Sequence, residues 1–238
     1  PIGIDLFAGA GGMSLGFEQA GFDIAAAVEI DPVHCAVHEF NFPRCKTICR
    51  SVTDLSGIEL RRLSGIANKD VDVLFGGAPC QGFSMIGKRA LDDPRNQLVK
   101  HFVRLVSEIR PKYFVLENVK GLTIGAPRKV LDEVVEEAAR IGYSVLLPYK
   151  VLDASSFGVP QHRERLFLIG ARKGIELPHY PLPTTKPAGT GNGAGLLKSG
   201  PSVWRAIGDL PDADAFATLL RSDAVKCKFG RSSSYAKL

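Results

Sequence analysis

Short runs of apolar residues alternate along the chain with longer segments in which apolar residues recur every three or four positions. Runs of the first kind are typical of buried strands, and segments of the second kind are typical of amphipathic helices. The pattern predicts strands at about residues 2–7, 24–28, 72–76, 113–117, 144–151 and 166–171, with a further short strand ahead of residue 54. It predicts helices at about residues 14–20, 32–41, 57–66, 96–109 and 127–140. This alternation indicates an α/β fold with a mainly parallel sheet.

The composition changes after residue 173. Residues 174–202 are rich in Pro, Gly, Thr and Lys and contain the stretch GTGNGAG, which is typical of a loop or linker. Residues 203–211 are expected to add one or two helical turns, and the residues at 230–235 are polar. We therefore predict a folded core at residues 1–173 and a linker or extension at residues 174–238.

The 238-residue chain has an ordinary composition for a globular protein, with 45% hydrophobic and 23% charged residues. No apolar stretch approaches the ~20 residues needed to cross a bilayer, and no signal peptide is recognised, so we expect no association with a membrane. The net charge of +5 favours a polyanionic partner only mildly.

The five cysteines follow neither a disulfide framework nor the spacing of a metal site. Their number is odd, which favours a reducing compartment. Cys35, Cys45 and Cys49 lie near His34 and His38 in the sequence, but they lack the paired C-x-x-C spacing of zinc sites. We therefore predict no metal and interpret these thiols as buried or incidental.

A glycine-rich turn is predicted between the first strand and the first helix. The stretch FAGAGGMS at residues 7–14 lets the backbone approach a ligand closely, with helix N–H groups facing it. The second strand ends at Glu29, 18 residues after Gly11, where a carboxylate can accept hydrogen bonds from both ribose hydroxyls. A dinucleotide fingerprint requires glycine where this chain has Ser14, so the pattern favours a nucleoside-containing cofactor of another kind. A tight glycine turn without a ligand is the alternative.

Three polar clusters lie next to predicted strands. Cys80 follows an apolar strand within the stretch GGAPCQGFS, and Glu117 directly follows four apolar residues. Arg163 and Arg165 occupy alternate positions before the last predicted strand, so they are expected to share one face. In open α/β sheets ligands bind outside the carboxyl ends of the strands, and a partly buried Glu117 there can hold a proton near neutral pH. Surface positions for Glu117 and for the two arginines are the alternatives.

A long loop at residues 81–96 separates Cys80 from the next helix. It contains glycines at positions 82 and 87 and the basic residues Lys88, Arg89 and Arg95. Loops of this length in a compact domain are typical of lids or binding loops, and the positive charges favour closure over phosphates.

Five stretches resemble motifs of the DNA (cytosine-5) methyltransferase family, in the family's order over residues 4–170. DLFAGAGG resembles its S-adenosylmethionine loop, and VEIDP resembles its ribose-binding acid. GGAPCQGFS resembles the nucleophile loop, LENVKG the ENV motif, and QHRERLFLIG the QxRxR motif. The resemblance implies a Rossmann-like S-adenosylmethionine-dependent methyltransferase fold, with a mostly parallel twisted sheet and helices on both faces. It implies S-adenosylmethionine as cofactor and S-adenosylhomocysteine as product.

The resemblance also implies covalent catalysis on a cytosine that is flipped out of double-stranded DNA. Cys80, as a thiolate, would add to C6 of the base, so that C5 becomes nucleophilic and takes the methyl group. Glu117 would hold the protonated N3 edge, and Arg165 with Arg163 would bind the O2 side of the base.

The remaining site residues are implied by the same motifs. On the cofactor side these are Phe7, the backbone of Gly9, Ala10, Gly11 and Gly12, the ribose-binding Glu29, the stacking residue Ile30, and Asp54, Leu55 and Leu98 near the adenine. On the DNA side they are the loop residues Gln81, Ser84, Lys88, Arg89 and Arg95. Without the resemblance, Asp54 would be interpreted as the N-cap of the helix that follows it.

Family members carry a target-recognition domain and two further motifs after the region that these stretches match. Residues 202–211 resemble the segment that leads into that domain, so we expect recognition to come from a further C-terminal region or from a second chain. The chain alone is expected to bind the cofactor weakly and to lack sequence-specific methylation. The resemblance also predicts a cytoplasmic, prokaryotic protein of a restriction-modification system, associated with the nucleoid.

Three alternatives are weighed against this function. An RNA cytosine methyltransferase acting on tRNA could share the scaffold, although the stretch PCQGFS is more similar to the DNA enzymes. A non-catalytic homologue that binds DNA or a protein partner would not need Cys80, Glu117 and Arg165 together. A nicotinamide-dependent oxidoreductase is disfavoured by Ser14.

Overall fold

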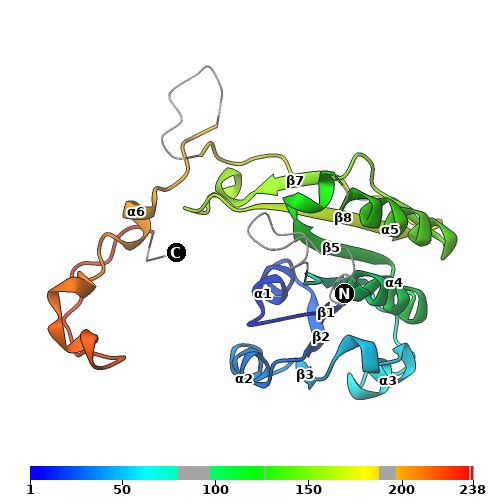
Figure 1. Cartoon of the computed structure of the whole chain (residues 1–238), viewed down its shortest axis with the longest axis horizontal. Helices are drawn as coiled ribbons and strands as arrows, with labels where there is room; N and C mark the ends of the chain where they lie inside the picture. The colour runs from blue at the N-terminus through cyan, green and yellow to red at the C-terminus, as the bar shows by residue number, and fades with distance from the viewer. Residues whose placement is uncertain (80–96, 126, 188–196, 236, 238) are drawn as a thin grey trace. The chain divides into compact units, whose positions relative to one another are not determined.

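The structure is a computed structural model that describes residues 1–79, 97–125, 127–187, 197–235 and 237 (Figure 1). Its strands are β1 (Ile2–Leu6), β2 (Asp23–Glu29), β3 (Lys46–Cys49), β4 (Val73–Gly76), β5 (Tyr113–Val119), β6 (Tyr143–Val145), β7 (Lys150–Asp153) and β8 (Glu164–Arg172). Its α-helices are α1 (Gly12–Gln19), α2 (Pro32–Asn41), α3 (Gly57–Leu63), α4 (Gln97–Ile109), α5 (Arg128–Arg140) and α6 (Val203–Ile207).

The strands form one sheet in the order β3-β2-β1-β4-β5-β8-β6, and β7 pairs with β8. The pairs from β3 to β5 are parallel, whereas β8 runs antiparallel to both β5 and β6. The chain therefore has the α/β fold with a mostly parallel sheet that the alternation of elements predicted. Because β1, β2, β4 and β5 are parallel, their carboxyl ends lie at one edge of the sheet.

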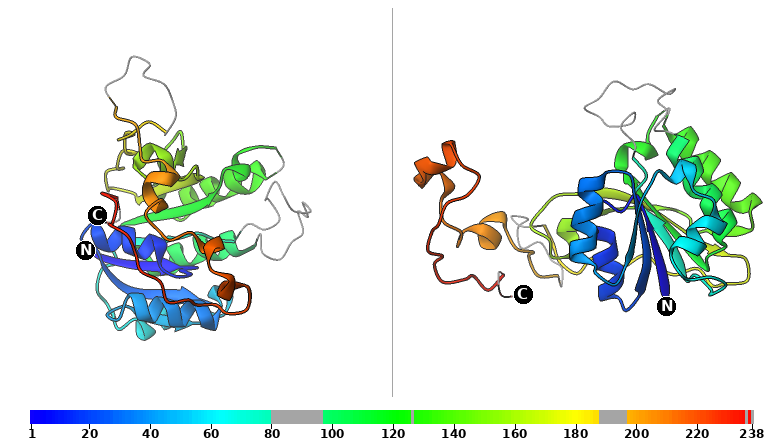
Figure 2. Two further views of the ribbon diagram at one scale, coloured as in Figure 1. Left: turned by 90° about the vertical axis from the view of Figure 1, so that its left-hand side faces the viewer. Right: turned by 90° about the horizontal axis from the view of Figure 1, so that it is seen from below.

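Helices cover both faces of the sheet, as Figure 2 shows in its right-hand view. Alternate side chains of a strand point to opposite faces. Ile4 and Leu6 of β1 pack into the larger core, which includes residues of α3, α4 and α5. On the other face Phe75 of β4 stacks on Phe17 of α1, with 4.0 Å between ring centroids. These two cores fix the carboxyl ends of β1 and β4.

Two elements differ from their predicted bounds. The single strand predicted at about 144–151 is interrupted between β6 and β7, where Pro148 has no backbone N–H to donate to a strand ladder. Helix α3 ends at Leu63, ahead of Gly65, whose φ of 68° lies in the left-handed region. The short strand expected ahead of residue 54 is β3.

The chain divides into two compact units, one comprising residues 1–151 and 165–180, the other residues 152–164 and 181–238. This partition does not follow the predicted division at residue 173, and the linker role predicted for residues 174–238 stays a prediction. The second unit contains α6, which lies within the segment expected to add helical turns; its N-cap Ser202 accepts a hydrogen bond from the amide of Arg205 at 3.1 Å. Over the described ranges, no helix has the length and apolarity to cross a membrane.

Candidate functional site

The chain between β1 and α1 turns through three residues with positive φ: Phe7 at 62°, Gly9 at 54° and Gly11 at 94°. A Cβ on Gly11 would lie 2.1 Å from Cε2 of Phe42, so both the backbone angle and the close contact require glycine. On the outer side, a Cβ built on Gly9 or Gly12 meets no atom within 4 Å. We call residues 7–12 the glycine loop. Its outer side leaves the backbone open, and its predicted contact with a ligand stays a prediction.

The carboxylate of Glu29, at the end of β2, is held by backbone amides from two segments. Its Oε2 accepts a hydrogen bond from the amide of Gly9 at 2.8 Å. Its Oε1 accepts from Ile30 at 2.9 Å and from Asp31 at 3.0 Å. A carboxylate has about four acceptor positions, so Glu29 can still accept a hydrogen bond from a hydroxyl group of a ligand. The bond from Gly9 also ties the glycine loop to the end of β2.

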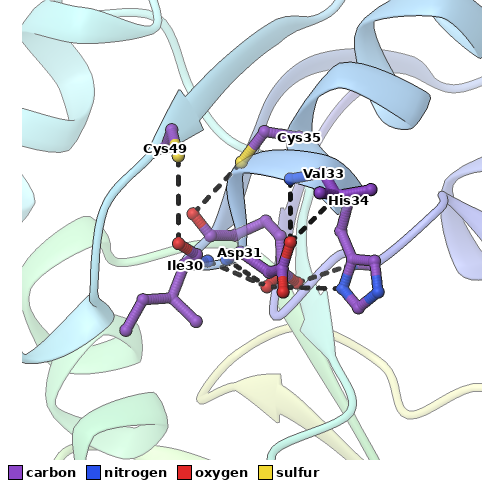
Figure 3. Close-up of polar contacts among 8 residues, drawn as sticks. Ile30, Asp31, Val33, His34, Cys35 and Cys49 are labelled. Carbon is purple, nitrogen blue, oxygen red and sulfur yellow. Dashed lines mark hydrogen bonds and ion pairs between the residues drawn. The ribbon is translucent and has the colours of Figure 1, made fainter.

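Of the two residues after Glu29, Ile30 exposes its side chain and Asp31 caps α2 (Figure 3). The Ile30 side chain is 68% exposed, an apolar surface next to a fixed carboxylate. The Asp31 carboxylate caps α2 by accepting from Val33 at 2.8 Å and His34 at 3.2 Å. These amides, that of His34 first, lower the pKa of Asp31. The turn therefore begins α2 with a charged, fixed cap.

Two thiols hold the carbonyl groups of the same turn (Figure 3). Cys35 Sγ of α2 donates to the carbonyl oxygen of Glu29 at 3.4 Å, and Cys49 Sγ of β3 donates to that of Ile30 at 3.8 Å. Burial first, and then the neighbouring Cys49, raise the pKa of Cys35 to about 12. Cys35 is therefore a protonated donor in this structure, and Cys35 and Cys49 are both free of disulfides.

Asp54, another predicted cofactor residue, lies in a turn shortly before α3. Asp54 ends a 3₁₀ turn, Val52–Asp54, and its carboxylate accepts from the hydroxyl of Thr53 at 2.8 Å. The capping interpretation of Asp54 is wrong, because Ser56 caps α3 through a bond from the amide of Glu59 at 3.2 Å.

Three further cofactor residues differ in exposure. Leu55 is 1% exposed and belongs to the core, so the structure does not favour its predicted contact with adenine through the side chain. Leu98, in the first turn of α4, is half-buried and packs on the core. Ala10 is exposed in the glycine loop, and its carbonyl accepts from the Asn41 amide at 3.1 Å.

A second carboxylate, Glu117 of β5, is paired with an arginine side chain. Arg165 Nε of β8 lies 3.0 Å from Glu117 Oε1, and the two side chains are only 25% and 20% exposed. A Cβ on Gly77, just after β4, would lie 2.8 Å from Glu117 Oε2, so glycine makes room for this carboxylate. In the sequence, Gly77 is marked only by its position beside Gly76, ahead of Cys80.

Asn118 connects β5 to the segment that leads to Cys80. Its side chain is 2% exposed, and its Nδ2 donates to the carbonyl of Ala78 at 3.2 Å. Its Oδ1 accepts from the amide of Val119 at 2.8 Å. Sequence reasoning included Asn118 in a motif without assigning it a task. Here it fixes the backbone two residues before Cys80.

The remaining predicted residues are not placed in this site. Cys80, Gln81, Ser84, Lys88, Arg89 and Arg95 lie outside the described residues. Arg163 precedes β8 and belongs to the second unit, where its amide donates to Asp153 at 3.1 Å. Its predicted common face with Arg165 therefore stays a prediction. In the part of the chain that the structure describes, no three His, Cys, Asp or Glu side chains are arranged to hold a metal ion.

The family model and the similar known proteins indicate the same family. The family model described as C-5 cytosine-specific DNA methylase matches residues 3–216. Type II methyltransferase M.XorII of Xanthomonas oryzae pv. oryzae is 59% identical over 236 residues, which are 99% of this chain and 52% of that protein. Type II methyltransferase M1.HphI of Haemophilus parahaemolyticus is 48% identical over 73% of this chain and 46% of its own length. The chain thus spans about half the length of these relatives.

Other relatives differ in length. Type II methyltransferase M.AquIA of Picosynechococcus sp. is 40% identical over 88% of this chain and 89% of its own length. Among solved structures, a prophage-encoded protein of E. coli described as a DNA modification methyltransferase superposes with a TM-score of 0.73. It is 34% identical, and the match covers 89% of this chain and 55% of that one.

Proposed function

The chain belongs to the C-5 cytosine-specific DNA methylase family, and from this premise we propose that it is the catalytic part of an enzyme that methylates C5 of cytosine in double-stranded DNA. The observation that supports this most is the edge formed by the carboxyl ends of the parallel strands. There the glycine loop and Glu29 follow β1 and β2, and Gly77 follows β4 beside the Glu117–Arg165 pair. A nucleoside site and a pair of charged side chains thus lie along one edge.

We propose that S-adenosylmethionine binds along the glycine loop and the end of β2. Glu29 fits the ribose, because its carboxylate is fixed by three backbone amides and has acceptor capacity left. The exposed Ile30 side chain offers a surface for adenine, and the open side of Gly9 and Gly12 offers backbone to the amino-acid part. The bound cofactor supplies a methyl group on a positively charged sulfur, and S-adenosylhomocysteine is left as product.

In the proposed reaction Cys80, as a thiolate, forms a bond to C6 of the flipped cytosine. Glu117 shares a proton with N3, which takes up the charge that develops on the ring, and Arg165 and Arg163 bind the O2 side. Electron density then gathers at C5, which bonds the methyl group. Loss of the C5 proton to a base lets the C6–S bond break, and its electron pair returns to Cys80. The Glu117–Arg165 contact at 3.0 Å supports this arrangement, since it holds the carboxylate in place beforehand.

We further propose that DNA recognition requires sequence beyond this region, with the residues around 81–97 closing over the flipped base. The relatives M.XorII and M1.HphI are about twice as long as their matched parts. In the second unit the large apolar side chains of Trp204, Leu220 and Phe229 are 78%, 87% and 71% exposed. Such side chains favour packing against further polypeptide. We also propose that the enzyme is cytoplasmic, as befits its bacterial relatives, and that it acts at the nucleoid, where its DNA substrate lies.

The proposal is tested with duplex DNA that contains 5-fluorocytosine. Fluorine at C5 blocks the elimination step, so the enzyme should remain covalently attached in the presence of S-adenosylmethionine. The chain is assayed alone, within the longer polypeptide that carries a C-terminal region, and with such a region added as a second chain. We expect a covalent complex with either source of the C-terminal region, and a weak one or none with the chain alone.

The matched variants are Cys80→Ser, which should form no complex, and Cys227→Ser, which should behave as wild type because the proposed reaction uses no thiol other than that of Cys80. A complex that survives Cys80→Ser would remove Cys80 as nucleophile. If none of these protein forms is trapped on 5-fluorocytosine DNA but one is trapped on 5-fluorocytosine RNA, the substrate is RNA and not DNA.

A further inference from the structure

A chain of buried polar side chains lies beneath the glycine loop and is not used by the proposed mechanism. It consists of Asp5 in β1, Ser14 in α1, His38 in α2 and Thr47 in β3, which are 1%, 0%, 0% and 8% exposed. Ser14 Oγ lies 2.7 Å from Asp5 Oδ2 and 3.2 Å from His38 Nε2. Thr47 Oγ1 lies 3.3 Å from His38 Nδ1. Buried polar groups that fully satisfy one another specify one arrangement of the elements that carry them.

Asp5 lies beside the first turn of α1, whose N-cap residue, Gly11, makes no side-chain bond to the helix. Ser14 is the third residue of α1, and the first amides of a helix have no partner within it. Asp5 Oδ2 accepts a hydrogen bond from the Ser14 hydroxyl at 2.7 Å, and the nearby Ser14 amide also lowers the pKa of Asp5. A carboxylate here also interacts favourably with the helix dipole. Asp5 therefore fixes the end of the glycine loop.

His38, toward the other end of this hydrogen-bonded chain, also contacts the glycine loop. A Cβ on Gly11 would meet Cε2 of Phe42 at 2.1 Å and Cδ2 of His38 at 3.0 Å, so these rings form the surface on which Gly11 rests. The two ring centroids are 4.6 Å apart. The His38 ring is thus in direct contact with the backbone that faces the proposed cofactor.

The number of protons fixes the direction of every bond in the chain. An ionised Asp5 only accepts, so the Ser14 hydroxyl donates to it, and Ser14 Oγ must accept from His38 Nε2–H. Nδ1 of the neutral imidazole then accepts from the Thr47 hydroxyl. A protonated Asp5 instead donates to Ser14, Ser14 donates to Nε2, and Nδ1–H donates to Thr47. Both directions give the Ser14 hydroxyl and both ring nitrogens of His38 a partner, and they differ by one proton.

We propose that Asp5 is a positioning residue for the glycine loop, and that uptake of one proton by Asp5 reverses the hydrogen bonds from Asp5 to Thr47 and so changes the loop's affinity for S-adenosylmethionine. The effect on affinity rests on the proposed function, whereas the reversal itself does not.

The charges around the chain support a titration near neutral pH. Burial, assisted by the negative charge of Glu29 and opposed by the hydroxyl and the amide of Ser14, raises the pKa of Asp5 to about 7. Burial lowers the pKa of His38 against the opposing effects of Glu29 and Glu39, which favours the neutral imidazole. Cys45, ahead of β3, also feels Asp5, and burial raises its pKa to about 12, so it stays protonated. Among the four hydrogen-bonded side chains from Asp5 to Thr47, Asp5 is therefore the group that we expect to change charge.

The reversal is tested by NMR on the 238-residue chain, without cofactor. The ¹³C shift of the Asp5 carboxyl group reports its protonation, and the ¹⁵N shifts of the His38 ring report which nitrogen carries the proton. We expect the Nε2–H tautomer at pH 8.5 and the Nδ1–H tautomer at pH 5.5, with one midpoint shared by both residues. A His38 ring that keeps one tautomer while Asp5 titrates, or an Asp5 that stays ionised down to pH 5, overturns the proposal.

Three variants sharpen this test. Asp5→Asn can donate to Ser14 Oγ, so it should hold His38 as Nδ1–H at every pH. Ser14→Ala should break the chain, so that the His38 tautomer no longer follows Asp5. Ser56→Ala removes a cap hydroxyl from α3, away from this chain, and should leave the reversal unchanged. The wild-type titration decides the question even if a variant fails to fold.

The functional consequence is tested by measuring the Kd for S-adenosylmethionine at pH 6 and pH 8 in the same protein. We expect a change of at least about fivefold in wild type and none in Asp5→Asn. His34→Gln should keep the change; it controls for His34, whose Nδ1 lies 3.9 Å from Glu29 Oε1. Reversal of the tautomer with a constant Kd would remove the positioning role. Reversal without any binding at either pH would contradict the proposed function and leave the proton-linked chain standing.

Discussion

The two carboxylates at the edge of the sheet contact different partners: backbone amides for Glu29, and a guanidinium for Glu117. Glu29, the last residue of β2, accepts from three backbone amides, and the thiols of Cys35 and Cys49 hold the carbonyls of the same turn. Glu117, in β5, is held by the Arg165 guanidinium from the antiparallel strand β8. Backbone amides cannot rotate away, so the first carboxylate has a fixed place. A side-chain pair can exchange partners, which suits a residue that handles a proton during a reaction.

Glycine serves the two regions for different reasons as well. In the glycine loop the backbone itself needs positive φ, at Gly9 and Gly11. After β4 the requirement is space: a Cβ on Gly76 would lie 2.1 Å from the carbonyl oxygen of Leu6, and one on Gly77 would lie 2.8 Å from Glu117 Oε2. One obstacle is backbone of the central strand and the other is the end of a side chain.

The largest expected effect comes from comparing alanine substitutions at these two neighbouring glycines. Gly76→Ala forces apart β4 and β1 in the buried sheet, and we expect a loss of unfolding free energy of about 3 kcal/mol or more. Gly77→Ala displaces only the Glu117 carboxylate, so stability should fall by less than about 1 kcal/mol while methyl transfer is lost. Urea denaturation and a methylation assay measure the two effects. Equal destabilisation by both variants would contradict the distinction between backbone and side-chain obstacles.

The pH dependence of stability should have opposite signs at two aspartates. The pKa of Asp5 rises from 3.8 to about 7 in the folded protein, so the folded state binds more protons than the unfolded state between these values. Its contribution is greatest below pH 4 and falls as pH rises to 7, by on the order of 4 kcal/mol. Asp5→Asn should flatten this decline.

Asp72 provides the contrast. Burial favours its neutral form, but Lys112 at 2.7 Å and the amide of Ile2 outweigh burial and lower its pKa. Its contribution is present above its ordinary value of 3.8 and is lost as pH falls through the lower folded value. Thermal unfolding of wild type and Asp72→Asn at pH 2–5 checks this. An Asp5→Asn protein whose stability still declines between pH 4 and pH 7 would assign that decline to another group.

The two carboxylates themselves give a smaller, more selective contrast. Glu29→Gln turns an acceptor into an N–H₂ group that faces backbone N–H donors, so we expect a loss of about 1–3 kcal/mol together with cofactor affinity. Glu117→Gln keeps an oxygen for Arg165 in a partly exposed pair, so stability should change by less than about 1 kcal/mol. Methyl transfer should nevertheless be lost, with cofactor affinity retained. Calorimetric binding and unfolding curves for both variants separate these results.

The sequence predicted what depends on local pattern, and it missed what depends on contacts between distant segments. The bounds of α2 agree with prediction because Asp31-Pro32 forms a local start signal. Ser14 was interpreted only as a missing glycine, whereas its hydroxyl belongs to a buried chain through three other elements. The role of Gly77 depends on Glu117, and that of Asn118 on Ala78, across neighbouring strands. Motif resemblance finds such residues by name but does not show which groups they touch.

The smallest expected effect comes from comparing two helix caps, one inside the candidate cofactor site and one outside it. Asp31 caps α2 directly after Ile30, and Ser56 caps α3. Removal of either cap leaves early helix amides without a partner, so Asp31→Ala and Ser56→Ala should each lower Tm by about 2–4 °C. Only Asp31→Ala should also weaken S-adenosylmethionine binding, because α2 begins at the turn that carries Glu29 and Ile30. If Ser56→Ala weakens binding as much, the fixed place of Glu29 depends on general stability and not on its own turn.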